Sequence, residues 1–318
     1  MVFVRWLDKI SKDWIDLAGS KGANLGELLT NQFPVPFGFV ITTNAFKNFI
    51  ESKKLGEKIN LVLEKSGTDP EKISEASLQI KQLILETEFP AEMKKEIIEA
   101  YKSLSFSDTI RDEKVLQLIS VGRDFALVAV RSSVPDDFSI GTKQTNFLNV
   151  KGIGDLLISV KNCWASFFES HSILELSKKD WDLRLGLVVQ RMINSEKSVV
   201  MKTDDSEDRI LIKATWGMGQ TLSSGKVKPD VYSVLKNGQI AEVKVSQKER
   251  MTIRDYATDR TIEIPVPKDK MEEQVLSDQD ISRLVKLGLQ VENHYQSPQE
   301  IEFALHLNKI YITQTKSL

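Results

Sequence analysis

Residues 19–29 read GSKGANLGELL, and the expected fold is built outward from this stretch. The small residues Gly19 and Ser20 precede a helical segment that runs from Lys21 to Leu29. Because the first turn of a helix leaves backbone N–H groups without intrahelical partners, this start can hold an anion, and Lys21 adds a mobile positive charge. A capped helix with an exposed lysine explains the same residues, so the motif alone does not decide the function.

A strand and more helices are expected directly after this stretch. The apolar run 37–41 predicts a strand, and Thr42, Thr43 and Asn44 offer an N-cap for a helix over 45–51. Residues 57–104 are rich in charge and carry apolar side chains near the helical period of 3.6 residues. They predict a solvated helical insert, and nothing in the insert indicates chemistry.

The second half of the chain is dominated by predicted strands. A long helix is expected at about 154–176, strands at 185–193, 198–203, 209–215, 230–236 and 239–245, a capped helix from Ser277 to about Asn293, and closing strands at 300–306 and 310–315. This pattern predicts a mixed α/β (α+β) fold. The break near 178–185 suggests two subdomains, residues 1–180 and 181–318.

The composition is typical of a soluble globular protein. Lys and Arg number 43 against 45 for Asp and Glu, so no general field attracts nucleic acid or an anionic membrane surface. The single cysteine, Cys163, excludes an internal disulfide and fits a reducing cytoplasm. No apolar run approaches the roughly 20 residues that a helix needs to cross a bilayer.

Two further segments offer groups that can hold phosphate. The apolar run 125–130 predicts a buried strand, and Arg131 at its end can bind a phosphate group bidentately. A structural ion pair is the alternative for Arg131. The next segment contains Gly141, Thr142 and Thr145, which can form a lid over a triphosphate, although turn chemistry explains these residues equally well.

The two closing strands bring together a third group of polar side chains. If the turn between them is centred on Asn308, Glu302 lies directly across from Gln314, and the strand period of two places Lys316 beside Gln314. Carboxylate and amide oxygens are hard ligands suited to Mg²⁺ bound to nucleotide phosphates. The polar face of an edge hairpin is the alternative. His306 is expected to share the face of Glu302, with a structural role.

Together these segments resemble the nucleotide-binding domain shared by phosphoenolpyruvate synthase, pyruvate phosphate dikinase and rifampin phosphotransferase. The matching runs are GSKGANLGELL, FPVPFGFVITTNAF, VAVRSS, TNFLNVKG, NCWASFF, LVVQRM, ATWGMGQTLSSGKVKPDVY, PQEIEFAL and YITQTK. They keep the family's order and span almost the whole chain, so their joint occurrence is specific. The resemblance implies an ATP-grasp-like fold with ATP held in a cleft between two α/β subdomains.

The resemblance also implies roles for residues in the first part of the chain. Lys21 and Arg131 match the lysine and arginine that bind the phosphates and carry the catalysis. Residues 141–145 match the glycine loop over the phosphates. Gln190 and Met192 lie in the strand that matches the hinge, whose backbone holds adenine.

In the last part of the chain, the resemblance implies the cofactors ATP and Mg²⁺. Glu302 and Gln314 match the pair that contacts metal and phosphate, in agreement with the hairpin geometry. Lys316 stands where the family has a final arginine, and a lysine cannot make the bidentate phosphate contact of an arginine.

The family's reaction implies a partner. ATP gives its β-phosphoryl group to a histidine on a separate swivelling domain and its γ-phosphoryl group to water, which leaves AMP and inorganic phosphate. A third domain then passes the group from the histidine to pyruvate or another acceptor. No run in this chain resembles the phosphohistidine segment or the barrel that binds pyruvate. A partner chain or domain is therefore expected to supply the phosphohistidine and phosphoenolpyruvate/pyruvate sites.

Other interpretations follow from departures from the family pattern. Relatives have Ser-Gly-Val where this chain has Ser198-Val-Val200, and Gln220 stands where they commonly carry glutamate. These differences favour a regulatory nucleotide-binding module with little catalysis. A stand-alone kinase that binds a small acceptor directly is a further alternative.

Overall fold

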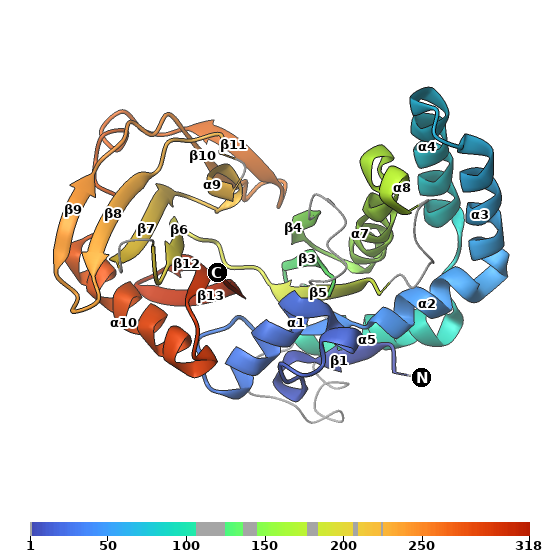
Figure 1. Ribbon diagram of the computed structural model, residues 1–318, viewed down its shortest axis with the longest axis horizontal. Helices are drawn as coiled ribbons and strands as arrows, with labels where there is room; N and C mark the ends of the chain where they lie inside the picture. The colour runs from blue at the N-terminus through green and yellow to red at the C-terminus, as the bar shows by residue number, and fades with distance from the viewer. Residues whose placement is uncertain (1, 106–124, 136–144, 177–183, 206–208, 224) are drawn as a thin grey trace. The chain divides into compact units, whose positions relative to one another are not determined.

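The computed structural model describes residues 2–105, 125–135, 145–176, 184–205, 209–223 and 225–318. The chain divides into two compact units, Met1–Thr30 with Phe37–Met192, and Asn31–Pro36 with Ile193–Leu318 (Figure 1). Both units combine helices with a sheet, so the expected α/β architecture is confirmed. Among the described residues, no helix has the length and apolar character needed to cross a membrane.

The first unit is built on a five-stranded sheet with the order β1-β2-β5-β3-β4. Its strands are β1 (Val4–Trp6), β2 (Gly38–Ile41), β3 (Val128–Ser133), β4 (Asn146–Val150) and β5 (Gly186–Arg191). Each neighbouring pair is antiparallel. Because β5 pairs with both β2 and β3, it belongs to the first unit, and the expected boundary at 180/181 falls before it.

The helices of the first unit cover the expected helical segments, although the first of them begins at Ile15 and not at Lys21. They are α1 (Ile15–Thr30), α2 (Thr43–Glu51), α3 (Leu55–Ser66), α4 (Pro70–Glu86), α5 (Ala91–Ser105), α7 (Ile153–Ala165) and α8 (Ser170–Leu176). Thr42 caps α2 by accepting a hydrogen bond from the Ala45 N–H at 3.3 Å. The single long helix expected at 154–176 is wrong, because the 3-10 turn η4 (Ser166–Phe168) separates α7 from α8.

One apolar core joins the sheet to the helices of the insert. Ile59, Ile73, Ile84 and Ile97 are buried in the same cluster as the strand residues. The segment 57–104 is therefore helical as predicted, but only its outer faces are solvated. Since each fully buried aliphatic side chain contributes about 1.5–3 kcal/mol, the insert is an integral part of the first unit.

The second unit contains a six-stranded sheet with the order β13-β12-β6-β7-β8-β9 and a separate hairpin, β10-β11. The strands are β6 (Lys197–Lys202), β7 (Arg209–Trp216), β8 (Asp230–Leu235), β9 (Ile240–Lys244), β10 (Arg250–Arg254), β11 (Thr261–Pro265), β12 (Gln299–His306) and β13 (Lys309–Ser317). The predicted strands are confirmed, whereas β10 and β11 were not expected from the sequence. A short helix, α9 (Gln220–Ser223), follows β7.

Helix α10 (Asp278–Tyr295) packs against the apolar face of this sheet. Its capping box is confirmed, since the Ser277 hydroxyl accepts from the Asp280 N–H and the Asp280 carboxylate accepts from the Ser277 N–H. A Cβ atom at Gly288 would lie 2.4 Å from the Met201 sulfur, so the glycine allows the helix to approach the strand closely.

A fully buried ion pair ties together three segments of the second unit. Lys248 Nζ lies 2.6 Å from Asp230 Oδ1, and neither side chain is exposed. The same carboxylate accepts from the Ser246 N–H at 2.9 Å and from the Val275 N–H at 2.8 Å. Asp230 therefore holds the start of β8, the segment after β9 and the approach to α10 in one network.

We expect Asp230→Ala to destabilise the protein by about 3–5 kcal/mol, because it leaves a buried lysine charge without compensation. Glu263→Ala is the control, since it removes a surface ion pair with Arg250 and is expected to cost less than about 1 kcal/mol. Urea denaturation measures both free energies of unfolding. Equal losses in the two variants would contradict a structural role for the buried network.

Candidate functional site

In the first unit, the turn at the start of α1 docks on the end of β3. Gly19 has φ 69° and ψ 163°, so the helix is kinked at this residue. Ser133 Oγ accepts from the Gly22 N–H at 2.9 Å and donates to the Ala18 carbonyl at 2.7 Å. A Cβ atom at Gly19 would lie 2.3 Å from the Ser133 carbonyl, which only glycine avoids. The segments GSKG and VAVRSS are thereby joined.

Lys21 and Arg131 both belong to these joined segments. Lys21 is only 6% exposed, which is unusual for a lysine. Arg131 is two residues from Ser133 in β3, so strand alternation puts both side chains on the face of the sheet that meets α1. The Ser132 N–H donates to the Thr145 carbonyl at 3.3 Å, so Thr145 borders the same stretch of β3.

Cys163 on α7 has a buried thiol whose pKa is shifted from its ordinary value. Burial raises the pKa of the Cys163 thiol to about 12, and the Lys21 charge opposes this shift. Cys163 Sγ lies 3.8 Å from the Val130 carbonyl and 3.9 Å from the Thr145 carbonyl. The thiol stays protonated at neutral pH and is no nucleophile.

Ser20 contributes a buried hydroxyl next to Lys21. Its side chain is 8% exposed, and its oxygen makes no hydrogen bond with any residue in the described part of the chain. Buried polar atoms normally have partners, so this hydroxyl fits a site that a ligand completes. A hydroxyl, a lysine and an arginine around the start of a helix suit a phosphate group.

Gln190 lies in the central strand β5, and Met192 directly follows the end of this strand. Gln190 is 2% exposed and its backbone lies between Gly38 on β2 and Ala129 on β3. The Met192 N–H donates to the Leu127 carbonyl at 2.9 Å. The sheet uses these backbone groups, and contact of Gln190 and Met192 with adenine stays a prediction.

The expected glycine loop is only partly described. Gly141 and Thr142 lie outside the described residues, and Thr145 immediately precedes β4. Their role over the phosphates stays a prediction.

In the second unit, the hairpin of β12 and β13 turns differently from the expectation. Leu307 and Asn308 have φ 46° and 60°, and His306 pairs with Lys309. The turn is therefore a two-residue turn of the kind favoured between antiparallel strands. The expected centre on Asn308 is wrong, since the centre lies between the two turn residues.

A β-bulge nevertheless gives the expected pairing of Glu302 with Gln314, which is confirmed. The register shifts by one residue between Glu302 and Phe303, so that Thr313 is the extra residue on β13. Thr313 Oγ1 donates to the Glu302 carbonyl at 3.3 Å. Thr313 thus helps to fix the backbone of Glu302, the residue that the bulge brings into register with Gln314.

Glu302 lies on the sheet face opposite α10. Phe303, the next residue, is buried on the α10 side. Glu302 pairs with Val200 of β6, and Val200 pairs with Lys213 of β7, so these three residues form one row across the sheet. Lys213 is exposed and was not identified from the sequence. The alternation of buried and exposed residues in RILIKATW was the signal that could have revealed it.

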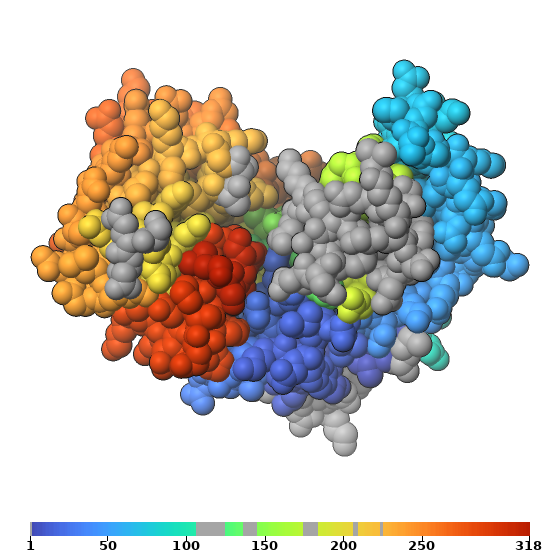
Figure 2. Space-filling view, in the orientation of Figure 1, coloured from blue at the N-terminus to red at the C-terminus, as the bar shows by residue number. Residues whose placement is uncertain are grey.

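Lys316 shares the face of Gln314 but is committed to another carboxylate. Its Nζ lies 2.8 Å from Glu300 Oε1, and its side chain is 57% exposed. The C-terminal residues, deep red in Figure 2, lie at the surface of the second unit. Glu300 is directly opposite Lys316 on the neighbouring strand, and contact of Lys316 with phosphate stays a prediction.

In the second unit, Glu302 and Gln314 suit Mg²⁺ only if a bound ligand supplies further oxygen atoms. No group of three or more His, Cys, Asp or Glu side chains suited to a metal occurs among the described residues. Glu302 and Gln314 offer two hard oxygens. Mg²⁺ characteristically binds through one or two carboxylates, with phosphates and water completing its six positions.

The match to a known family covers nearly all of these features. Residues 15–318 match the family described as pyruvate phosphate dikinase, AMP/ATP-binding domain. This chain belongs to that family. In this AMP/ATP-binding domain, the polar residues around Lys21 and those around Glu302 both lie within the matched region.

Named relatives of this AMP/ATP-binding domain are longer proteins. A probable phosphoenolpyruvate synthase of Methanocaldococcus jannaschii is 35% identical over 333 residues, which cover 100% of this chain and 27% of that protein. One of Archaeoglobus fulgidus is 38% identical over 328 residues, with coverage of 99% and 41%. The chain thus spans less than half the length of these relatives. A solved D-alanine–D-alanine ligase of Bacillus anthracis aligns with 71% of this chain and 56% of its own, at 12% identity and a TM-score of 0.28, too low to compare folds.

We expect Gly19→Ala to destabilise the AMP/ATP-binding domain more than Gly67→Ala. Both glycines have positive φ, 69° and 54°, so both substitutions strain the backbone. Only at Gly19 would the new Cβ atom meet backbone atoms, because nothing lies within 4 Å of a Cβ atom at Gly67. The expected losses are about 3 kcal/mol and about 1 kcal/mol, measured by urea denaturation. Similar losses would show that contact with Ser133 does not fix the turn.

Proposed function

We propose that this domain binds ATP with Mg²⁺ and transfers a phosphoryl group from ATP to a histidine on a separate domain or chain. The observation that carries the proposal is the docking of the Gly19 turn on Ser133. It gives Lys21 and Arg131 a common frame beside a buried Ser20 hydroxyl that has no partner among the described residues. The family match and the phosphoenolpyruvate synthases among the relatives support the same function.

In the proposed reaction, the protein acts by positioning and by neutralising charge. Lys21 and Arg131 bind the phosphate oxygens and stabilise the charge that spreads over them during transfer. Thr145, with Gly141 and Thr142, covers the phosphates, and the segment of Gln190 and Met192 contacts adenine. These roles and the ATP-grasp-like arrangement that the resemblance implies are part of the proposal.

Glu302 and Gln314 are the residues that would hold Mg²⁺ in this proposal. The ion supplies additional positive charge to the phosphates when it is bound. The paired strands present the carboxylate and the amide directly across from one another, so both oxygens can face one ligand.

A second candidate function is a nucleotide-binding module with little turnover. The ion pair of Lys316 with Glu300 at 2.8 Å favours it, because this cation is already neutralised. In this alternative the domain binds ATP and signals its presence without forming products.

Product analysis separates the two functions. The chain is incubated with ATP and Mg²⁺, alone and with the phosphohistidine domain of a phosphoenolpyruvate synthase added as a second protein. We expect AMP and inorganic phosphate only when the second protein is present, and at least a tenfold loss of this activity in Lys21→Met, since a phosphate-binding cation is removed.

The matched control for Lys21→Met is Lys65→Met, a substitution on the outer part of the insert helix α3. It is expected to leave product formation unchanged. ATP binding without products would favour the module, and ADP formed with a small acceptor alone would favour a stand-alone kinase.

We expect Glu302→Gln to weaken ATP binding by about tenfold in the presence of Mg²⁺ and to have little effect without it, because only the metal needs the carboxylate charge. Glu300→Gln is the matched control on the same face of β12, and it removes the pairing with Lys316 instead. Isothermal titration calorimetry with and without EDTA measures the affinities. An equal effect of Glu302→Gln in both conditions would argue against a metal ligand.

A further inference from the structure

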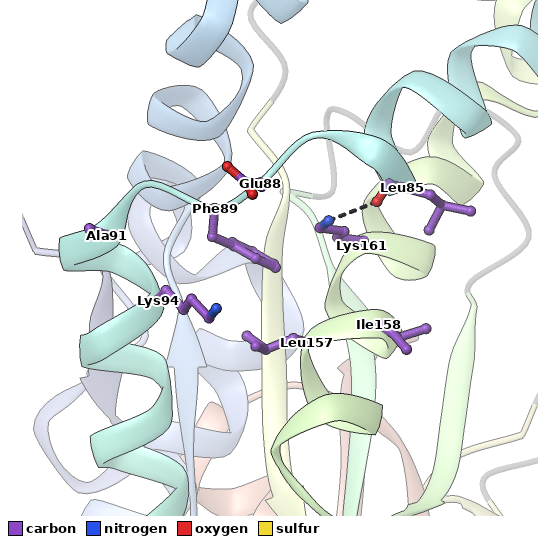
Figure 3. Close-up of a pocket in the computed structure, with 8 residues that line it drawn as sticks. All are labelled: Leu85, Glu88, Phe89, Ala91, Lys94, Leu157, Ile158 and Lys161. Atoms are coloured by element: carbon purple, nitrogen blue, oxygen red, sulfur yellow. Dashed lines mark hydrogen bonds between the residues drawn. The ribbon is translucent and has the colours of Figure 1, made fainter.

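A pocket of about 610 Å³ opens on the helical side of the first unit (Figure 3). It lies between the end of α4, the start of α5 and one face of α7. The lining combines apolar side chains with two lysines and one glutamate, and consists of Leu85, Glu88, Phe89, Ala91, Lys94, Leu157, Ile158 and Lys161. The volume is in the range of sites for small molecules. None of the residues assigned above to phosphate, adenine or metal lines it.

The apolar part of the pocket is held firmly in place. The Phe89 ring packs against the rings of Phe49 and Trp164, with centroids 5.4 Å and 5.8 Å away. Leu157 and Ile158 project from α7, and Ile158 remains 57% exposed. An exposed large apolar side chain beside a fixed aromatic ring offers a preformed surface for an apolar group.

Two ammonium groups border this apolar surface. Lys161 Nζ donates to the Leu85 carbonyl at 2.8 Å and lies 5.3 Å from the centre of the Phe89 ring. Lys94 extends from α5 toward Leu157 (Figure 3). Burial lowers the pKa of Lys161 despite the opposing charge of Glu88, and the charge of Lys94 lowers it further. Lys94 and Lys161 thus line the same pocket with charges of the same sign.

The one carboxylate of the lining is bonded to a lysine outside the lining. Glu88 Oε2 lies 2.6 Å from Lys53 Nζ, and Lys53 is not among the lining residues. This hydrogen bond is the main cause of the lowered pKa of Glu88. With Glu88 paired to Lys53, the pocket keeps the positive charges of Lys94 and Lys161 in excess.

We propose that this pocket binds a small amphipathic anion. An aromatic or branched aliphatic body packs against Phe89, Leu157 and Ile158, and a carboxylate or sulfonate faces Lys94 and Lys161. Both ammonium groups attract an anion, which they do not do for a neutral or cationic ligand. A nucleoside triphosphate is disfavoured, because it carries too much charge for a largely apolar lining.

The probe for this site is 1-anilinonaphthalene-8-sulfonate, compared with N-phenyl-1-naphthylamine, which lacks the sulfonate. Both are titrated against the intact chain by fluorescence. We expect saturable binding of one sulfonate molecule per chain, at least about tenfold tighter than binding of the uncharged compound. The affinity for the sulfonate is expected to fall as NaCl is raised.

Variants at the rim of the pocket locate the binding. Lys94→Gln combined with Lys161→Met is expected to weaken the sulfonate by about tenfold or more and to leave the uncharged compound unchanged. Ile158→Glu, at an exposed position, adds a negative charge and is expected to weaken the sulfonate as well. Lys95→Gln is the matched control, since Lys95 neighbours Lys94 on α5 but pairs with Glu99 at 3.9 Å.

The proposal is overturned if the sulfonate does not bind, if both compounds bind equally well, or if the rim variants keep the wild-type affinity. Thermal unfolding of each variant checks that the helices around the pocket are intact. Because Ile158 is exposed, Ile158→Glu is expected to fold even if the Lys161 variant does not, so the site is still tested.

Discussion

The hydroxyl of Ser133 is the contact on which the cationic side of the site depends. It accepts a hydrogen bond from α1 and returns one to the same helix on the other side of the Gly19 kink. Since Gly19 is pressed against the Ser133 backbone, helix and strand cannot shift separately. Lys21 and Arg131, which lie more than a hundred residues apart in sequence, therefore share one rigid frame. In such a frame the two cationic side chains are already in place before a ligand binds, so binding does not have to organise them.

The second unit reaches comparable rigidity by a different route. Its sheet is anchored by the buried Asp230 carboxylate, whose oxygens serve a lysine and backbone N–H groups from two other segments. A buried polar network of this kind is stable only when every member is satisfied. Glu302 lies on β12, between two hydrogen-bonded neighbours in the same sheet, so the carboxylate is carried by a well-supported strand rather than by a loop.

Local signals explain what could be predicted from the sequence. The caps at Thr42 and Ser277 and the apolar run of β5 depend on neighbouring residues alone, and all three were predicted. The break of the long helix after Ala165 was missed, because no proline or glycine marks it and the Ser166 hydroxyl simply bonds back to the Cys163 carbonyl. The pairing of Lys316 with Glu300 follows from the same register that places Glu302 across from Gln314, so it could have been predicted although it was not. The pocket beside Phe89 depends on the packing of helices from distant parts of the chain, which composition and period do not encode.

The extra residue Thr313 divides the last strand into two stretches of opposite parity. Before it, Ile310 and Ile312 face the apolar side, and after it Thr315 takes that side while Gln314 faces outward. A chain that lost this one residue would form a regular ladder, in which Gln314 directly follows Ile312 and still lies across from Glu302 on the outward side. The hairpin therefore tolerates the loss of Thr313 better than the loss of Ile312, whose side chain fills the apolar side.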